Sequence, residues 1–143
     1  NLYTDFLPHM VGEDGVIRGP AGNGRVAAVT RADIARVAEV VLKEPSAHKG
    51  ASYDLTGPEA LSFAEIAQIL AEVTGRNISF HNETVAEAYA SRLRWQAPQW
   101  QYDAWVSTYT AVAAGELARV SDQVRQLTGR RPESLRDFFD QTC

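Results

Sequence analysis

The chain has 143 residues, the size of one ordinary domain, and its 45% apolar and 22% charged residues are typical of a globular protein. The net charge of −4 argues against a nucleic-acid partner or an anionic membrane, because both require a concentrated basic surface. No apolar run approaches the roughly 18 residues of a membrane-spanning helix. The only cysteine is Cys143, so an internal disulfide is impossible and we expect a cytoplasmic protein.

The N-terminal part of the chain predicts a broken helix followed by a hairpin. Residues 1–15 carry apolar side chains at helical spacing that Pro8 interrupts, so we expect a short, broken helix or a loop. In the next segment, Val16–Val29, two apolar runs flank a glycine-rich turn, and Asn23-Gly24 favours a type I′ hairpin turn. The glycine spacing also resembles a phosphate-binding loop. Such a loop leads directly into a helix, whereas Arg25 begins a further extended segment, so the hairpin is favoured.

Four pairs of residues predict helix starts. In each pair a Ser or Thr hydroxyl can accept the backbone N–H of an acidic residue three positions later, while the carboxylate reaches back to the cap residue. The pairs are Thr30 with Asp33, Ser62 with Glu65, Thr84 with Glu87, and Ser134 with Asp137. The apolar stripe of the first helix comprises Ile34, Val37, Ala38, Val41 and Leu42. We expect that helix to end before Pro45, and the second helix to end at Gly75.

Strands and one more helix lie between these starts. Gly50–Thr56 is typical of a strand, because its apolar residues are followed by a Gly-Pro pair that cannot continue a ladder. Ile78 and Phe80 alternate with polar neighbours, as in a half-buried strand. Residues Ser121–Thr128 are expected to form a short helix closed by Gly129.

An aromatic group follows the third capped helix. It comprises Trp95, Trp100, Tyr102, Trp105 and Tyr109, and Pro98 suits the first turn of a helix that carries several of them. Aromatic faces could wall a pocket for a flat organic molecule, because they give contact area at little entropic cost. The helical spacing also fits packing in the core, and this interpretation is favoured. The sequence does not exclude a pocket, so both interpretations stay open.

The residues carry no recognisable catalytic or metal-binding motif. His9, His48 and His81 lie far apart, and no two have the i, i+4 spacing that holds a metal on a helix. No Gly-x-Ser-x-Gly sequence is present, so hydrolase chemistry is not expected. We therefore expect no metal, and the catalytic residues stay unknown.

Several motifs occur in order along the chain. They are Asn1–Phe6, Gly19–Arg25 running into Thr30–Ala35, Tyr53–Glu59, and Leu127–Pro132 followed by Phe138-Phe139. Together they resemble the C-terminal half of NmrA-like proteins, and most closely the NAD(P)H-dependent quinone reductases among these atypical short-chain dehydrogenases. The Tyr-x-x-x-Lys pair of typical members is absent. Atypical members often transfer hydride directly from the nicotinamide to a bound acceptor.

The resemblance implies an α/β fold, or α+β for these residues alone. The chain would be the helix-rich, substrate-binding C-terminal portion of a Rossmann-type NAD(P)-binding protein, with a few short strands. It implies that Asn1, Tyr3 and Phe6 line the cleft beside the nicotinamide, with Asn1 as the candidate cofactor contact. Trp105 is a further candidate for binding a quinone or similar flat acceptor. The alternative is a non-catalytic dinucleotide-sensing regulator or an inactive remnant.

The family's glycine fingerprint lies upstream of the matching motifs. We therefore expect NADP or NAD to bind the complete protein and not this chain alone, which is a single unit over residues 1–143 and a fragment without the dinucleotide-binding portion. In the family fold the strand around Tyr53 joins a sheet formed mostly by upstream sequence. Unpaired edges and uncovered faces then favour self-association or pairing with the N-terminal half. The faces expected to be partly uncovered carry Ile34, Val37, Val41, Ile66 and Leu70.

Overall fold

The computed structural model describes residues 2–142. Asn1 and Cys143 lie outside the described residues, as do the side chains of Leu2, Tyr3 and Asp5. The helices are α1 Leu2–Met10, α2 Arg31–Lys43, α3 Phe63–Thr74, α4 Val85–Arg92, the 3₁₀ turn η1 Leu93–Trp95, α5 Gln99–Ala113, α6 Gln123–Thr128 and α7 Leu135–Thr142. The strands are β1 Val16–Gly19, β2 Arg25–Val26, β3 Leu61–Ser62 and β4 Ser79–Asn82. The fold is helix-rich with a few short strands, as expected.

The predicted helix starts are confirmed. Ser62 and Thr84 each accept the N–H of the acidic residue three positions on, and that carboxylate returns a bond to the cap backbone. Thr30 accepts the N–H of Asp33 in the same way, at 3.2 Å. Because these signals depend only on neighbours along the chain, the sequence determines them without the rest of the fold.

The predicted hairpin is wrong. β1 pairs in parallel with β4, and β2 pairs antiparallel with β3, so the two strands do not pair with each other. The turn itself exists, with Gly24 N–H donating to the carbonyl of Ala21 at 3.0 Å, and its positive φ of 56° lies at Gly22. Asn23 does not adopt the positive φ that a type I′ turn requires, so the strands diverge after the turn.

The predicted strand at Gly50–Thr56 is also absent from the described part of the chain. The segment is irregular there: Ala51 N–H donates to the His48 carbonyl at 3.1 Å, and Gly57 N–H, just after the segment, donates to the Ala27 carbonyl at 3.3 Å. A strand requires a ladder partner, and none of the described segments provides one for Gly50–Thr56.

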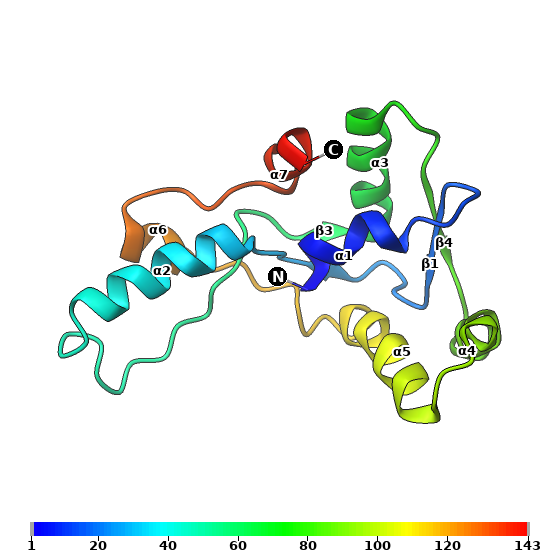
Figure 1. The fold of residues 1–143 in the computed structure, drawn as a ribbon, viewed down its shortest axis with the longest axis horizontal. Helices are drawn as coiled ribbons and strands as arrows, with labels where there is room; N and C mark the ends of the chain where they lie inside the picture. Colours follow the sequence, from blue (N-terminus) through cyan, green and yellow to red (C-terminus); the bar gives the residue numbers. More distant parts are fainter. Residues whose placement is uncertain (1, 143) are drawn as a thin grey trace.

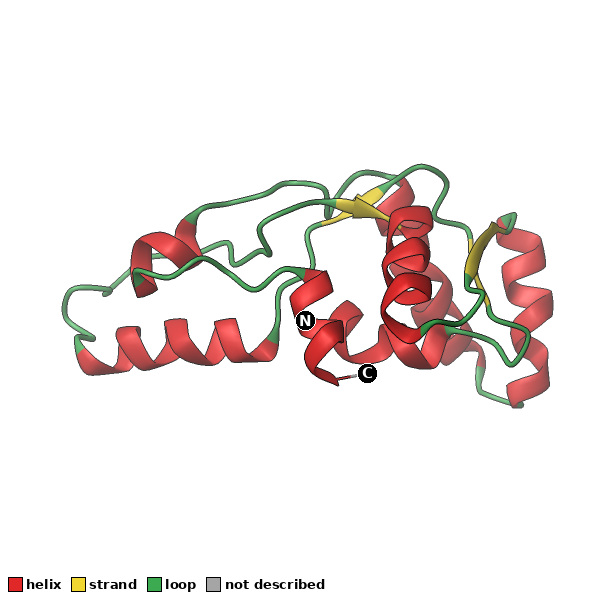
Figure 2. Cartoon of the chain, turned by 90° about the horizontal axis from the view of Figure 1, so that it is seen from above, coloured by secondary structure: helices red, strands yellow, loops and turns green. Residues whose placement is uncertain are grey.

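The helices form two lobes joined by extended segments. α2 and α6 lie side by side at one end, and α3, α4 and α5 lie with β1 and β4 at the other (Figure 1; Figure 2). The main core fills the larger lobe and contains Leu7, Ile17, Phe63, Ile66, Leu70, Val112 and Phe139. A smaller cluster of Val29, Val37 and Val124 joins α2 to α6.

Burial corrects two expectations about helix faces. Leu42, expected on the apolar stripe, is 77% exposed in the last turn of α2. Ile66, Leu70 and Val37 were expected to be partly uncovered, but this chain's own residues bury them. α7 packs on α3 and so covers the α3 face, whereas Ile34 on α2 stays half-exposed.

Candidate functional site

Phe6 is the one candidate in the first segment whose side chain the structure describes. It lies on α1 with 47% of its surface exposed, while the next residue, Leu7, is fully buried in the core. Leu7 therefore anchors the helix and leaves the Phe6 ring toward solvent. Tyr3 lies on the same helix, but its side chain, like Asn1, falls outside the described residues.

Trp105 belongs to an aromatic corner, which we define as Leu93, Trp95, Trp100, Tyr102 and Trp105. Trp105 meets the rings of Trp95 and Tyr102 edge-on, with centroids 5.9 and 5.8 Å apart. The Tyr102 hydroxyl accepts the Ala97 N–H at 2.8 Å, which fixes the turn between η1 and α5. Trp100 stays 68% exposed. The corner therefore presents large aromatic surfaces on a fixed backbone.

The aromatic group divides between core and surface. Tyr109 is buried and packs on Phe63 at 5.1 Å, and burial raises the pKa of its phenol above the usual value. Tyr102 is also buried. The two interpretations left open by the sequence thus apply to different members. Among the described residues no ring contact joins Phe6 to Trp105, so the structure does not bring these two candidates together.

Polar residues border the aromatic corner. The Tyr89 hydroxyl on α4 donates to Asp103 on α5 at 2.8 Å, and this hydrogen bond raises the pKa of Tyr89 above its usual value. Gln99 donates to the same carboxylate. Arg94 lies over the Trp95 ring at 4.3 Å. A flat ligand would therefore meet aromatic faces with hydrogen-bonding groups at their edge.

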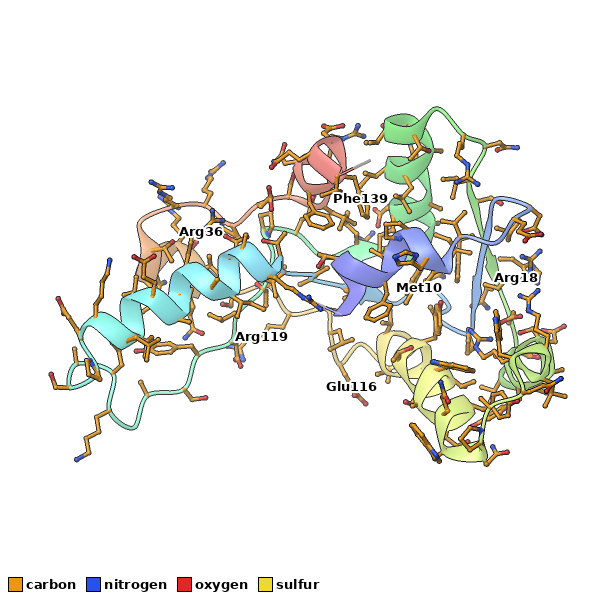
Figure 3. All side chains as sticks on the ribbon, in the orientation of Figure 1. Met10, Arg18, Arg36, Glu116, Arg119 and Phe139 are labelled. Atoms are coloured by element: carbon orange, nitrogen blue, oxygen red, sulfur yellow. The ribbon has the colours of Figure 1, made fainter. Side chains whose placement is uncertain are left out.

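An open groove of about 480 Å³ runs along the extended segments between the lobes. Its lining comprises residues 26–29, residues 53–56, Glu116, Leu117 and Arg119. Glu116 and Arg119 extend from the segment after α5 (Figure 3). Arg119 pairs with Asp54 at 3.3 Å, and the Tyr53 hydroxyl contacts His48 at 2.7 Å.

The glycine-rich turn does not fit a pyrophosphate. After Gly24 the chain continues as β2, so the turn does not lead into a helix N-terminus that could face a phosphate. Within the described residues no group of three or more His, Cys, Asp or Glu is arranged to hold a metal. In the same range, no helix is long and apolar enough to cross a membrane.

A buried ion pair was missed by the sequence analysis. Arg92 on α4 donates to Glu83 at 3.0 Å, and only 8% and 4% of the two side chains are exposed. Arg92 also donates to the carbonyls of Ala88 and Arg18 and lies over the Tyr109 ring at 5.3 Å. Both residues look like ordinary surface charges in the sequence. Their burial depends on the packing of α4 against β1 and α5, which the sequence does not state.

The amino-acid sequence of this chain is similar to those of several dehydrogenases and reductases. No family model matches the chain. Agroclavine dehydrogenase of Claviceps fusiformis is 33% identical over 134 residues, covering 94% of this chain and 46% of that protein. NAD(P)H azoreductase of Xenophilus azovorans is 33% identical over 126 residues, covering 88% of this chain and 44% of that protein. The chain therefore spans about half the length of the curated relatives it matches.

The fold has a close match among solved structures. The crystal structure of an NADPH-dependent quinone oxidoreductase from Escherichia coli matches with a TM-score of 0.86 and 27% sequence identity. The match covers 99% of this chain and 50% of that chain. The backbone fold of this chain is therefore one that Rossmann-type NAD(P)-binding reductases share over about half of their length.

Proposed function

Because this chain belongs to the NmrA-like family of NAD(P)H-dependent reductases, we propose that it is the substrate-binding portion of an oxidoreductase that reduces a quinone or similar flat acceptor. The main support is the match to the quinone oxidoreductase over nearly the whole chain. The azoreductase adds support, because azo compounds are also flat and conjugated. In this proposal the cofactor supplies the hydride and the protein orients the acceptor.

We propose Asn1, Tyr3, Phe6 and Trp105 as the residues that contact the ligands. The exposure of the Phe6 ring supports this role, because the other face of its helix is anchored in the core. For Trp105 the support is the contact of its ring with two neighbouring rings, which hold it in place. Asn1 would lie beside the nicotinamide. The pyrophosphate would be held outside these residues, since the glycine-rich turn does not fit it.

Activity of the complete protein tests the proposal. We expect NADPH oxidation with a panel of substituted quinones, and we expect Phe6→Ala and Trp105→Ala to raise the KM for the quinone about threefold to tenfold, because each removes an aromatic contact worth roughly 0.5–1.5 kcal/mol. Tyr3→Ala is expected to behave in the same way. Steady-state kinetics and the melting temperature are measured for each variant.

Leu42→Ala is the matched control, since Leu42 is an exposed apolar residue at the far end of α2. It should leave the KM unchanged. Cofactor binding without turnover of any quinone would favour the dinucleotide-sensing alternative. Variants that lose several kcal/mol of stability with no specific change in KM would identify these aromatics as core residues.

We further propose that the segment around Tyr53 pairs with sequence beyond this chain in the complete protein, or with a second copy when the chain is alone. Its support is the open backbone at Leu55, within this segment. Leu55 has no backbone hydrogen bond among the described residues, although it lies next to the buried Val29 in the lining of the groove. Open backbone on an extended segment is a site for adding a strand.

Hydrogen exchange tests the pairing. In a dilute solution of this chain, the Leu55 amide should exchange rapidly, whereas the Ala27 amide, which donates to Leu117 at 2.9 Å, should be protected. In the complete protein both amides should exchange slowly. A Leu55 amide as protected as Ala27 in the dilute chain would contradict the proposal, and so would rapid exchange of Leu55 in the complete protein.

A further inference from the structure

A second open groove lies where the C-terminal segment passes α6. We call it the arginine groove, and it has a volume of about 380 Å³. Its lining comprises Pro58, Val120, Ser121, Asp122, Arg125, Arg131 and Pro132. It shares no lining residue with the groove between the lobes, and none of its residues belongs to the aromatic corner.

Hydrogen bonds fix the walls of the arginine groove. Ser121 N–H donates to the Thr56 hydroxyl at 2.9 Å, which holds the start of α6 against the segment before Pro58. On the opposite side, Glu133 N–H donates to the buried carboxylate of Asp33 at 2.8 Å. This bond ties the segment after Arg131 to α2. The groove is therefore preorganised by contacts between residues far apart in the chain.

The arginines of the groove differ from most others in the protein by having no carboxylate partner. The pairs elsewhere are Arg18–Asp14, Arg25–Glu65, Arg36–Asp33, Arg92–Glu83, Arg119–Asp54 and Arg136–Glu72. Arg125 and Arg131 make no ion pair or side-chain hydrogen bond with the residues that the structure describes. Asp122 is the one acidic residue in the lining, and it pairs with neither. Two arginines with no ion-pair partner among the described residues thus line one hollow.

We propose that the arginine groove binds a phosphate group through Arg125 and Arg131. A guanidinium group presents a planar fork of N–H donors that matches phosphate oxygens, and two such groups suit a doubly charged anion better than a singly charged carboxylate. The Ser121 hydroxyl already donates to the Asp54 carbonyl, so the arginines provide the contacts. The site is separate from the proposed acceptor site and does not depend on it.

Calorimetric titration of the protein with inorganic phosphate and with adenosine monophosphate tests the site, with sodium chloride at matched ionic strength as the reference. We expect millimolar or tighter binding of phosphate, and a loss of about tenfold or more in Arg125→Gln/Arg131→Gln. If adenosine monophosphate binds more tightly than inorganic phosphate, the ligand of the groove is a nucleoside phosphate. If the two bind with equal affinity, the ligand is free phosphate.

Arg130→Gln is the matched control, because Arg130 precedes Arg131 but does not line the groove. It should bind phosphate as the unchanged protein does. The proposal fails if phosphate produces no more heat than chloride. It also fails if Arg130→Gln weakens binding as much as the double variant, since the effect would then reflect overall charge. Quinone reduction is unaffected by either failure, so the two proposals are tested separately.

Discussion

Arg92→Met is expected to lower the free energy of unfolding by about 3–5 kcal/mol, because it leaves the Glu83 carboxylate buried without its partner. The Arg92 guanidinium donates to Glu83 at 3.0 Å and to the Arg18 carbonyl at 3.2 Å, so it links α4 to β1 and to the residue that follows β4. Methionine keeps the length of the side chain but supplies no donor. Urea unfolding followed by tryptophan fluorescence measures the loss.

Two controls separate burial from charge. Lys43→Met removes the partner of Glu39, a pair with 70% and 62% of its side chains exposed, and should change stability by no more than about 1 kcal/mol. Arg92→Met combined with Glu83→Leu removes both buried charges and should recover much of the loss. A loss for Arg92→Met as small as that for Lys43→Met would show that water reaches the pair.

Local signals in the sequence were sufficient for the capped helices but not for α1, which runs unbroken through Pro8 where a broken helix or a loop was expected. The capping pairs at Ser62 and Thr84 form as predicted, and Gly75 and Gly129 end their helices with positive φ. Each of these features depends on residues within four positions of one another. The neighbouring residues therefore specify such boundaries whatever the rest of the chain does.

The sequence did not predict which strands pair with each other. Ile17 lies opposite Phe80 in the parallel pair, and a residue pattern does not state which strand will be the partner. The Asn23-Gly24 signal describes a local preference, and the pairing of β1 with β4 and of β2 with β3 overrides it. The segment around Tyr53 shows the opposite case, a strand pattern without a partner among the described residues.

The candidate site was predicted only in part, for a similar reason. Trp95 and Tyr102 have the same apolar character in sequence, but the turn at Gln96 exposes one and buries the other. The unpaired state of Arg125 and Arg131 could not be predicted either, because it depends on where every nearby carboxylate lies. Motif order indicated the family, whereas the exposure of individual side chains required the fold.

Two glycines of the turn between β1 and β2 have different structural roles. A Cβ atom on Gly24 would lie 2.0 Å from the Val112 carbonyl oxygen at the end of α5, far inside van der Waals contact. Gly22 has open space around its Cβ position but a φ of 56°, in the left-handed region. Gly24 is therefore required for the close approach of β2 to α5, and Gly22 for the direction of the turn.

Gly24→Ala is accordingly expected to destabilise the protein by about 3 kcal/mol, because the added methyl group must displace the backbone at the end of α5. Gly22→Ala should cost only about 1–2 kcal/mol, the penalty for a left-handed residue, and Gly22→Asn should cost less, since asparagine tolerates that conformation. Thermal unfolding of these three variants and of Gly24→Asn measures the order. If Gly24→Asn were tolerated as well as Gly22→Asn, Gly24 would be adopting the positive φ of a hairpin turn, and the contact with α5 would be wrong.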